Sequence, residues 1–212
     1  MTTDSEPQPP RSLRRLSTRS GQPVYSLSIL AIVWCALFGW ALLLDGDFTL
    51  WPPPRASVTA LTMLGALRLP LSQTSDLWHA ATAPLLHVDA LHLGGSLSTL
   101  IVIAATWPFP RGRSLWGALA WCAAASVLGS IATYRADPVL CVGPSGALCG
   151  ALSAACCARA AIGERLLWAA LLATFLLAGW RWHGDQAAHV SGLCAGCLWG
   201  LRLRLAAARQ GT

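Results

Sequence analysis

The sequence predicts an all-α polytopic membrane protein, and two observations support this prediction. Hydrophobic residues make up 55% of the 212 residues, and charged residues only 11%. A soluble domain of this length does not need so much apolar sequence. The apolar residues also gather in runs, several of which approach the roughly 20 residues that cross the hydrocarbon core of a bilayer. Membrane insertion is therefore the expected class.

Six of these apolar runs are predicted to be membrane spans, forming one domain over residues 24–204. The runs are Val24–Leu44, His87–Trp107, Ser114–Tyr134, Ser145–Ala160, Arg165–Trp182 and His189–Leu203. The fourth and sixth are short for a full crossing, which would leave room for water above their starts. A signal peptide is the alternative for the first run. That run is too long for one, and no small-x-small cleavage site precedes Asp45, so we expect it to be retained.

The segments outside the spans are predicted as two tails and one long connection. Residues 1–23 are rich in Pro, Ser, Thr and Arg and are expected to be a flexible cytoplasmic tail, and 205–212 a cytoplasmic C-terminal tail. The long outer loop covers 45–86. Pro52–Pro54 rules out a helix there, whereas Ala56–Leu69 is apolar enough to lie in the membrane interface. We expect a re-entrant or interfacial element packed on the bundle, with a plain outer loop as the alternative.

The arginines predict how the chain is oriented. All 15 basic residues are arginine. With a cytoplasmic N-terminus, eleven lie in inner segments: Arg11, Arg14, Arg15, Arg19, Arg111, Arg113, Arg159, Arg165, Arg202, Arg204 and Arg209. The outer segments hold four: Arg55, Arg68, Arg135 and Arg181. Cytoplasmic loops retain basic residues, so both termini are expected to be cytoplasmic. The net charge of +6 is then a topology signal and not a nucleic-acid footprint, and we expect no nucleic-acid partner.

Two short motifs bring reactive side chains to the outer ends of spans. Gly143–Gly146 reads Gly-Pro-Ser-Gly and opens the fourth span, and His189–Gly192 reads His-Val-Ser-Gly and opens the sixth. An ionisable residue inside a membrane is costly and is a functional-site hypothesis by default. Ser145, exposed by its flanking glycines, is a candidate nucleophile, and His189 is its candidate general base. The alternative for the first motif is a turn that leads into a helix N-cap.

Small residues on the same two spans predict that the two helices lie close together. His189, Gly192 and Gly196 share one helix face, and Gly146 follows the serine, so these glycines are candidate packing positions near the site. The small-residue face of the fourth span consists of Ser145, Cys149, Ser153 and Cys156. If these faces meet, the imidazole approaches the hydroxyl. The alternative is a packing seam with an incidental histidine.

A third motif lies before the second span, where His87 and His92 form a His-x4-His pair. This pair lacks a third ligand at metal spacing, so no metal is expected. Together with the Gly-x-Ser-Gly and His motifs, it resembles the rhomboid family of intramembrane serine proteases over roughly residues 76–202. The resemblance implies a six-transmembrane-helix rhomboid-like bundle that hydrolyses peptide bonds in or near the transmembrane segments of membrane proteins. No buried carboxylate is expected to orient the imidazole, so Ser145 and His189 would form a dyad without a cofactor.

The resemblance also assigns an oxyanion site. In the family, the second histidine and an asparagine four residues later help the amide of the serine to hold the oxyanion. This role falls to His92 and, with a shorter side chain in place of the asparagine, to Ser96; Gly143 is assigned to the same site. His79 stands where the family has an arginine. Cys149 replaces the aromatic residue or histidine that stacks on the catalytic histidine.

The compact core and the Ser-Gly-Ala-Leu-Cys-Gly segment at 145–150 are similar to rhombosortases, which are paired with substrates bearing a C-terminal Gly-Gly-type anchor. This implies single-span membrane substrates, a bacterial inner membrane and an active site facing the periplasm. A client-binding pseudoprotease is the main alternative, although such proteins usually lack the serine or the histidine. A small transporter would need polar groups deep on several helices. Of eight cysteines, only Cys141 is expected to face outward, and a disulfide is left open.

Overall fold

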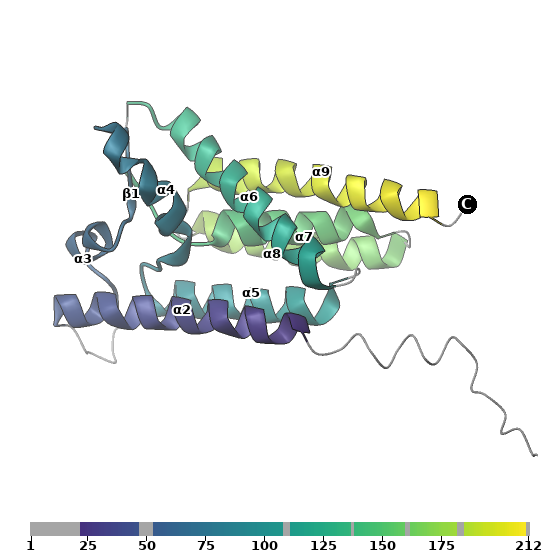
Figure 1. The fold of residues 1–212 in the computed structure, drawn as a ribbon, viewed down its shortest axis with the longest axis horizontal. Helices are drawn as coiled ribbons and strands as arrows, with labels where there is room; N and C mark the ends of the chain where they lie inside the picture. The colour runs from purple at the N-terminus through teal and green to yellow at the C-terminus, as the bar shows by residue number, and fades with distance from the viewer. Residues whose placement is uncertain are drawn as a thin grey trace, which may run out of the picture.

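The computed structural model describes residues 22–46, 53–107, 111–136, 138–159, 162–181 and 185–210. Long helices dominate these ranges, and each coincides with one of the predicted apolar runs (Figure 1). They are α2 (Gln22–Asp45), α5 (Ala90–Thr106), α6 (Arg111–Thr133), α7 (Ser145–Ala158), α8 (Ile162–Arg181) and α9 (Gln186–Gln210). The start of α2 and the end of α9 lie at the same end of the bundle.

The apolar helices indicate an integral membrane protein. Within the described residues, three helical segments are long and apolar enough to cross a membrane: Leu27–Asp45, Ser114–Thr133 and Gln186–Arg209. Two further apolar helices, Ala90–Ala105 and Ser145–Ala158, are shorter. Many large hydrophobic side chains of these helices point outward, which a soluble monomer rarely tolerates in such numbers. The count of six spans stays a prediction.

The two predicted tails differ in outcome. The helix α9 continues to Gln210, so most of the segment 205–212, which we expected to be a tail, is helical. The reason is local, because Leu205 and the three alanines at 206–208 are among the best helix formers. Residues 1–21, which hold nearly all of the predicted N-terminal tail, lie outside the described part of the chain.

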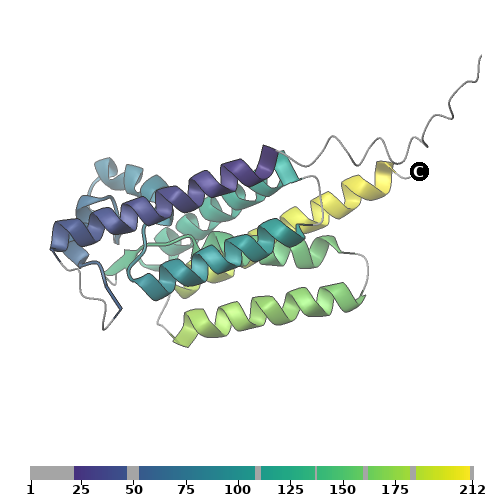
Figure 2. The ribbon, with the colours of Figure 1, turned by 90° about the horizontal axis from the view of Figure 1, so that it is seen from below.

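The short helix α7 is the centre of the bundle. It contacts α5, α6, α8 and α9, and every residue from Gly146 to Ala155 is buried. Viewed from below, α2 and α8 lie on opposite sides of the molecule (Figure 2). The small side chains of α7 allow this close approach from several directions. The main hydrophobic core includes Leu148 and Leu152 of α7 together with Ile103 of α5 and Trp34 of α2.

The long segment between α2 and α5 is folded against one end of the bundle (Figure 1). Its elements are α3 (Val58–Met63), β1 (Leu67–Leu69), a 3-10 turn (Thr74–Trp78), α4 (His79–Thr82) and a second 3-10 turn (Ala83–Leu85). The strand β1 pairs antiparallel with β2 (Val139–Cys141), with Leu67 opposite Cys141. The alternative of a plain loop does not describe this segment. Because β2 leads directly into Gly143–Gly146, the pairing fixes the chain just before α7.

Candidate active site

Ser145 is the first residue of α7 and follows a turn that only glycine accommodates. Gly143 has a φ of +101°, a region that side chains rarely adopt. A Cβ atom there would also lie 2.4 Å from Cε1 of His92. The amide of Gly143 donates a hydrogen bond to the carbonyl of Ala83, at 2.8 Å. The turn is thus held by the long segment on one side and by the His92 ring on the other.

His189 lies in the first turn of α9 and is only 2% exposed. The start of this helix is capped by Asp185, whose Oδ1 accepts a hydrogen bond from the amide of Ala188 at 2.9 Å. The backbone carbonyl of Asp185 accepts from the amide of His189 at 3.2 Å. A side-chain cap of this kind defines where a helix begins. Because Asp185 sets where α9 begins, it also places His189 in the first turn of this helix.

The N-terminal halves of α7 and α9 are in direct backbone contact. A Cβ atom on Gly192 would lie 2.1 Å from the carbonyl oxygen of Gly146, and one on Gly196 would lie 1.9 Å from that of Gly150. The predicted small-residue face of α7 takes part as well, since Sγ of Cys149 donates to the carbonyl of His189 at 3.6 Å. The structure thus brings the helix starts that carry Ser145 and His189 to one end of the bundle.

His92 lies beside this end, in the first turn of α5. Its amide donates to Oδ1 of Asp89, the N-cap of the helix, at 2.7 Å. Its half-buried ring packs on Gly143. Ser96 is one helical turn further along α5 and is buried. The amide of Gly143 already donates a hydrogen bond to the carbonyl of Ala83. The amide of Ser145 is one of the first amides of α7, and these have no acceptor within their own helix.

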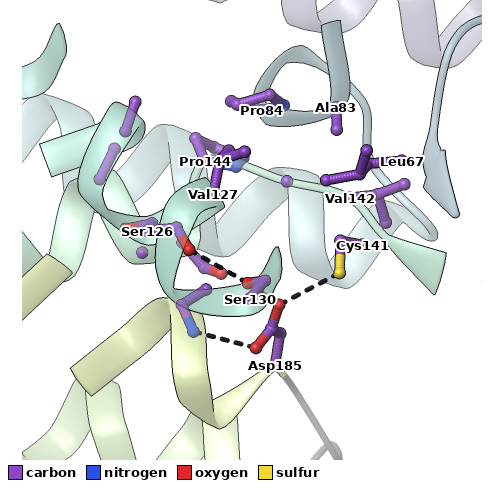
Figure 3. A pocket seen from close by; sticks show the side chains of 16 residues that line it. Leu67, Ala83, Pro84, Ser126, Val127, Ser130, Cys141, Val142, Pro144 and Asp185 are labelled. Atoms are coloured by element: carbon purple, nitrogen blue, oxygen red, sulfur yellow. Dashed lines mark hydrogen bonds between the residues drawn. The ribbon is translucent and has the colours of Figure 1, made fainter. Parts of the chain in front are cut away.

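A small cavity opens next to Ser145 (Figure 3). Its volume of about 30 Å³ is enough for roughly one or two water molecules or a small side chain. Gly143 and Ser145 line it from the α7 side, Ser126 and Ser130 from α6, and Asp185 from the start of α9. An apolar cavity with a few convergent polar groups is the usual form of a binding site.

Asp185 is the functional candidate that the sequence analysis missed. Its half-buried carboxylate accepts hydrogen bonds from the hydroxyl of Ser130 and, at 3.2 Å, from the thiol of Cys141 (Figure 3). It therefore joins α6, β2 and α9 around the cavity. An aspartate just before an apolar helix is an N-cap signal, and that signal could have identified it.

Cys141 was expected to face outward, but it is buried. Burial raises the pKa of its thiol to about 12, and the neighbouring Asp185 carboxylate contributes to the increase. The thiol therefore stays protonated at neutral pH and acts as a donor to the carboxylate. All eight cysteines are free thiols in the structure. Among the described residues, no cluster of three or more His, Cys, Asp or Glu side chains could hold a metal ion.

Comparison with known proteins relates the site to a family. The family profile described as "Rhomboid domain" matches residues 74–206, which is more than half of the chain. The matched segment contains Ser145, His189 and the pair His87 and His92, whereas α2 lies before it. A search of curated proteins finds no match.

Proposed function

The chain belongs to the rhomboid family, and from this premise we propose that it is an intramembrane serine endopeptidase in which Ser145 and His189 form the catalytic dyad. Members of this family are generally intramembrane serine proteases. The observation that carries the proposal is the backbone contact between Gly146 and Gly192, one and three residues beyond the two reactive side chains. Such a contact is needed if an imidazole is to reach a hydroxyl on another helix.

The proposed reaction uses each residue in a defined role. Oγ of Ser145 attacks the carbonyl carbon of the scissile bond while His189 takes its proton. The oxyanion that forms is held by the amide of Ser145 and by the ring of His92, and the positive end of the α7 dipole favours the negative charge. His189 then donates the proton to the leaving amine, and water hydrolyses the acyl-enzyme with His189 as base. Ser96 contributes to the oxyanion site if its hydroxyl reaches it.

The proposed substrates are single-span membrane proteins, including proteins with C-terminal Gly-Gly-type anchors as cleaved by rhombosortases. The cavity beside Ser145 is small, with a volume of about 30 Å³, and this favours a substrate with small side chains at the cut site. We place the chain in a bacterial inner membrane with six spans, cytoplasmic termini and the site toward the periplasm. The excess of arginines in the inner segments supports this orientation.

Reconstitution with a single-span reporter tests the proposal. The purified protein in liposomes should cut a reporter that carries small residues at the outer end of its span. The Ser145→Ala and His189→Ala variants should each abolish cleavage, and the double variant should be no worse, because the pair acts as a unit. Ser98→Ala, on the exposed side of α5, is the matched control and should cut normally. Substantial cleavage by Ser145→Ala would refute the mechanism.

A further inference from the structure

Three buried or half-buried rings connect α2 to the candidate oxyanion site. The indole of Trp34 meets the imidazole of His87 edge to face, with ring centroids 5.3 Å apart and an angle of 63°. His87 meets His92 in the same way, at 5.2 Å and 62°. Trp34 and His87 are 2% and 1% exposed. Edge-to-face contacts of this kind are attractive and directional, because the positive ring edge meets the negative face.

The buried His87 ring interacts with the backbone of Leu85 but has no hydrogen bond of good geometry. Neither of its nitrogens, nor Nε1 of Trp34, has a hydrogen-bond partner within the described part of the chain. A buried polar group without a partner is destabilising, so an imidazole is a poor choice if the site only needs to be filled. What His87 does offer is a flat ring between two others. The contacts that the structure shows on both sides of His87 are ring contacts, with Trp34 and with His92.

The stack ends at the turn before the nucleophile. The His92 ring packs so closely on Gly143 that a Cβ atom there would lie 2.4 Å from Cε1 and 2.9 Å from Nε2. The χ2 torsion of a histidine is broad, so the backbone of α5 alone does not fix the ring plane. The contacts of the ring with His87 and with Gly143 restrict it.

The other end of the stack belongs to α2, which packs along α5. Trp34 is the largest fully buried side chain of α2, and it lies outside the segment 74–206 that matches the family profile. The helix α2 therefore contacts the site through this indole, in addition to the apolar contacts that Ala41 and Leu37 make around Leu86.

We propose that Trp34 and His87 are positioning residues for His92: the indole fixes the His87 ring, and that ring holds the His92 imidazole over Gly143 in the orientation that binds the oxyanion. This inference rests on the proposed function, because it gives the orientation of His92 a catalytic purpose. It makes α2 part of the catalytic apparatus and not only a membrane anchor.

A double-mutant cycle in the liposome cleavage assay tests the proposal. His92→Ala should lower kcat about 10²- to 10³-fold, the usual loss for one oxyanion donor. His87→Leu and Trp34→Leu should each lower kcat about 10- to 100-fold at unchanged KM, because a misplaced group costs turnover and not substrate binding. His87→Phe keeps a ring and should retain most of the activity. In the His92→Ala background, the His87 and Trp34 substitutions should cause no further loss.

A purely structural role predicts the opposite pattern. Losses of kcat that multiply in the His92→Ala background, or His87→Leu with normal kcat, would overturn the proposal. The matched control is Phe38→Leu, which removes another buried aromatic ring of α2 that takes no part in the stack. It should leave kcat unchanged.

A second measurement does not depend on proteolysis. In histidine-labelled protein, NMR spectra contain signals from only five histidines. Trp34 contacts His87, so Trp34→Leu should shift or broaden the ring signals of both His87 and His92, and Phe38→Leu should not. If the His87 signal changes and the His92 signal does not, the proposed positioning of His92 by Trp34 and His87 is refuted, even if no cleavage is ever seen. Absence of Ser145-dependent cleavage, in contrast, refutes the proposed function.

Discussion

The contact between α7 and α9 can be tested by adding a single methyl group. Gly192 faces the carbonyl oxygen of Gly146, and a Cβ atom in that position would lie 2.1 Å from this oxygen and 2.7 Å from Oγ of Ser126. The first of these atoms belongs to the backbone of α7 and the second to a side chain of α6, and both helices are packed in the bundle. The substitution Gly192→Ala therefore forces the two helices apart exactly where Ser145 and His189 should meet.

The size of the effect follows from this geometry. Ordinary contacts begin at 3.4 Å, so the helices must separate by roughly 1.3 Å to relieve the clash with Gly146. Overpacking of this kind costs about 1–3 kcal/mol of folding free energy. A displacement of about 1 Å in a catalytic pair lowers turnover about 10²-fold. We therefore expect Gly192→Ala to fold with reduced stability and to lose most of its kcat.

Two measurements on the same detergent-purified samples separate the effects. Thermal unfolding gives the loss of stability, and the reporter assay at a temperature where the variant is folded gives kcat. Gly39→Ala is the matched control, because Gly39 also lies inside a helix and a Cβ atom there meets nothing within 4 Å. This control should be as stable as the parent protein, or slightly more stable, since alanine favours helix. Normal kcat and stability in Gly192→Ala would refute the close α7–α9 contact.

Three further predictions concern the cavity and the substrate. Asp185→Asn keeps an acceptor for the helix cap but cannot accept hydrogen bonds from both Ser130 and Cys141. It should therefore lower the free energy of unfolding, measured by thermal unfolding, by about 1–2 kcal/mol, and Asp185→Ala should lower it more. Equal stability of all three forms would contradict these hydrogen bonds. With a pKa of about 12 in place of 9.0, Cys141 should react with a maleimide at pH 8 about 10³-fold more slowly than an ordinary thiol, and faster once Asp185 is replaced by Asn. A mass-spectrometric time course of labelling checks this, and fast labelling in the folded parent protein is the contrary result. Replacing small residues at the outer edge of a substrate span with Leu should block its release into the soluble fraction, because Gly and other small residues lower the cost of unwinding the span and exposing its backbone. A Leu variant that is released equally well argues against this choice.

The positions of the helices could be predicted from the sequence because an apolar run must satisfy its backbone internally within a membrane. The predicted fourth span and α7 both begin at Ser145. The structure adds the reason for this start, because Gly143 has a φ of +101° and so lies outside the helix. The end of α9 was placed several residues too early. The apolar run ends at the arginines near residue 204, but the helix does not end there. The alanines that follow favour helix, and α9 continues to Gln210.

Contacts between distant segments could not be predicted in the same way. The pairing of β1 with β2 joins residues 70 to 74 positions apart, and the three-residue strands carry no alternating pattern long enough to detect. Asp185 was not predicted because it lies outside the predicted spans and caps the start of α9. The stack of Trp34 on His87 depends on how α2 packs against α5, and no local pattern encodes that.

These distant contacts have one property in common: they all converge on the turn that precedes Ser145. The amide of Gly143 is held by Ala83, its Cα by the His92 ring, and the strand before it by Leu67–Leu69. A glycine at φ +101° has many other conformations available, so local sequence alone would leave this turn mobile. Restraint from the long segment between α2 and α5 and from the His92 ring of α5 removes that freedom before any substrate arrives. In the proposed reaction this matters because an oxyanion site stabilises charge only to the extent that its donors are already in place.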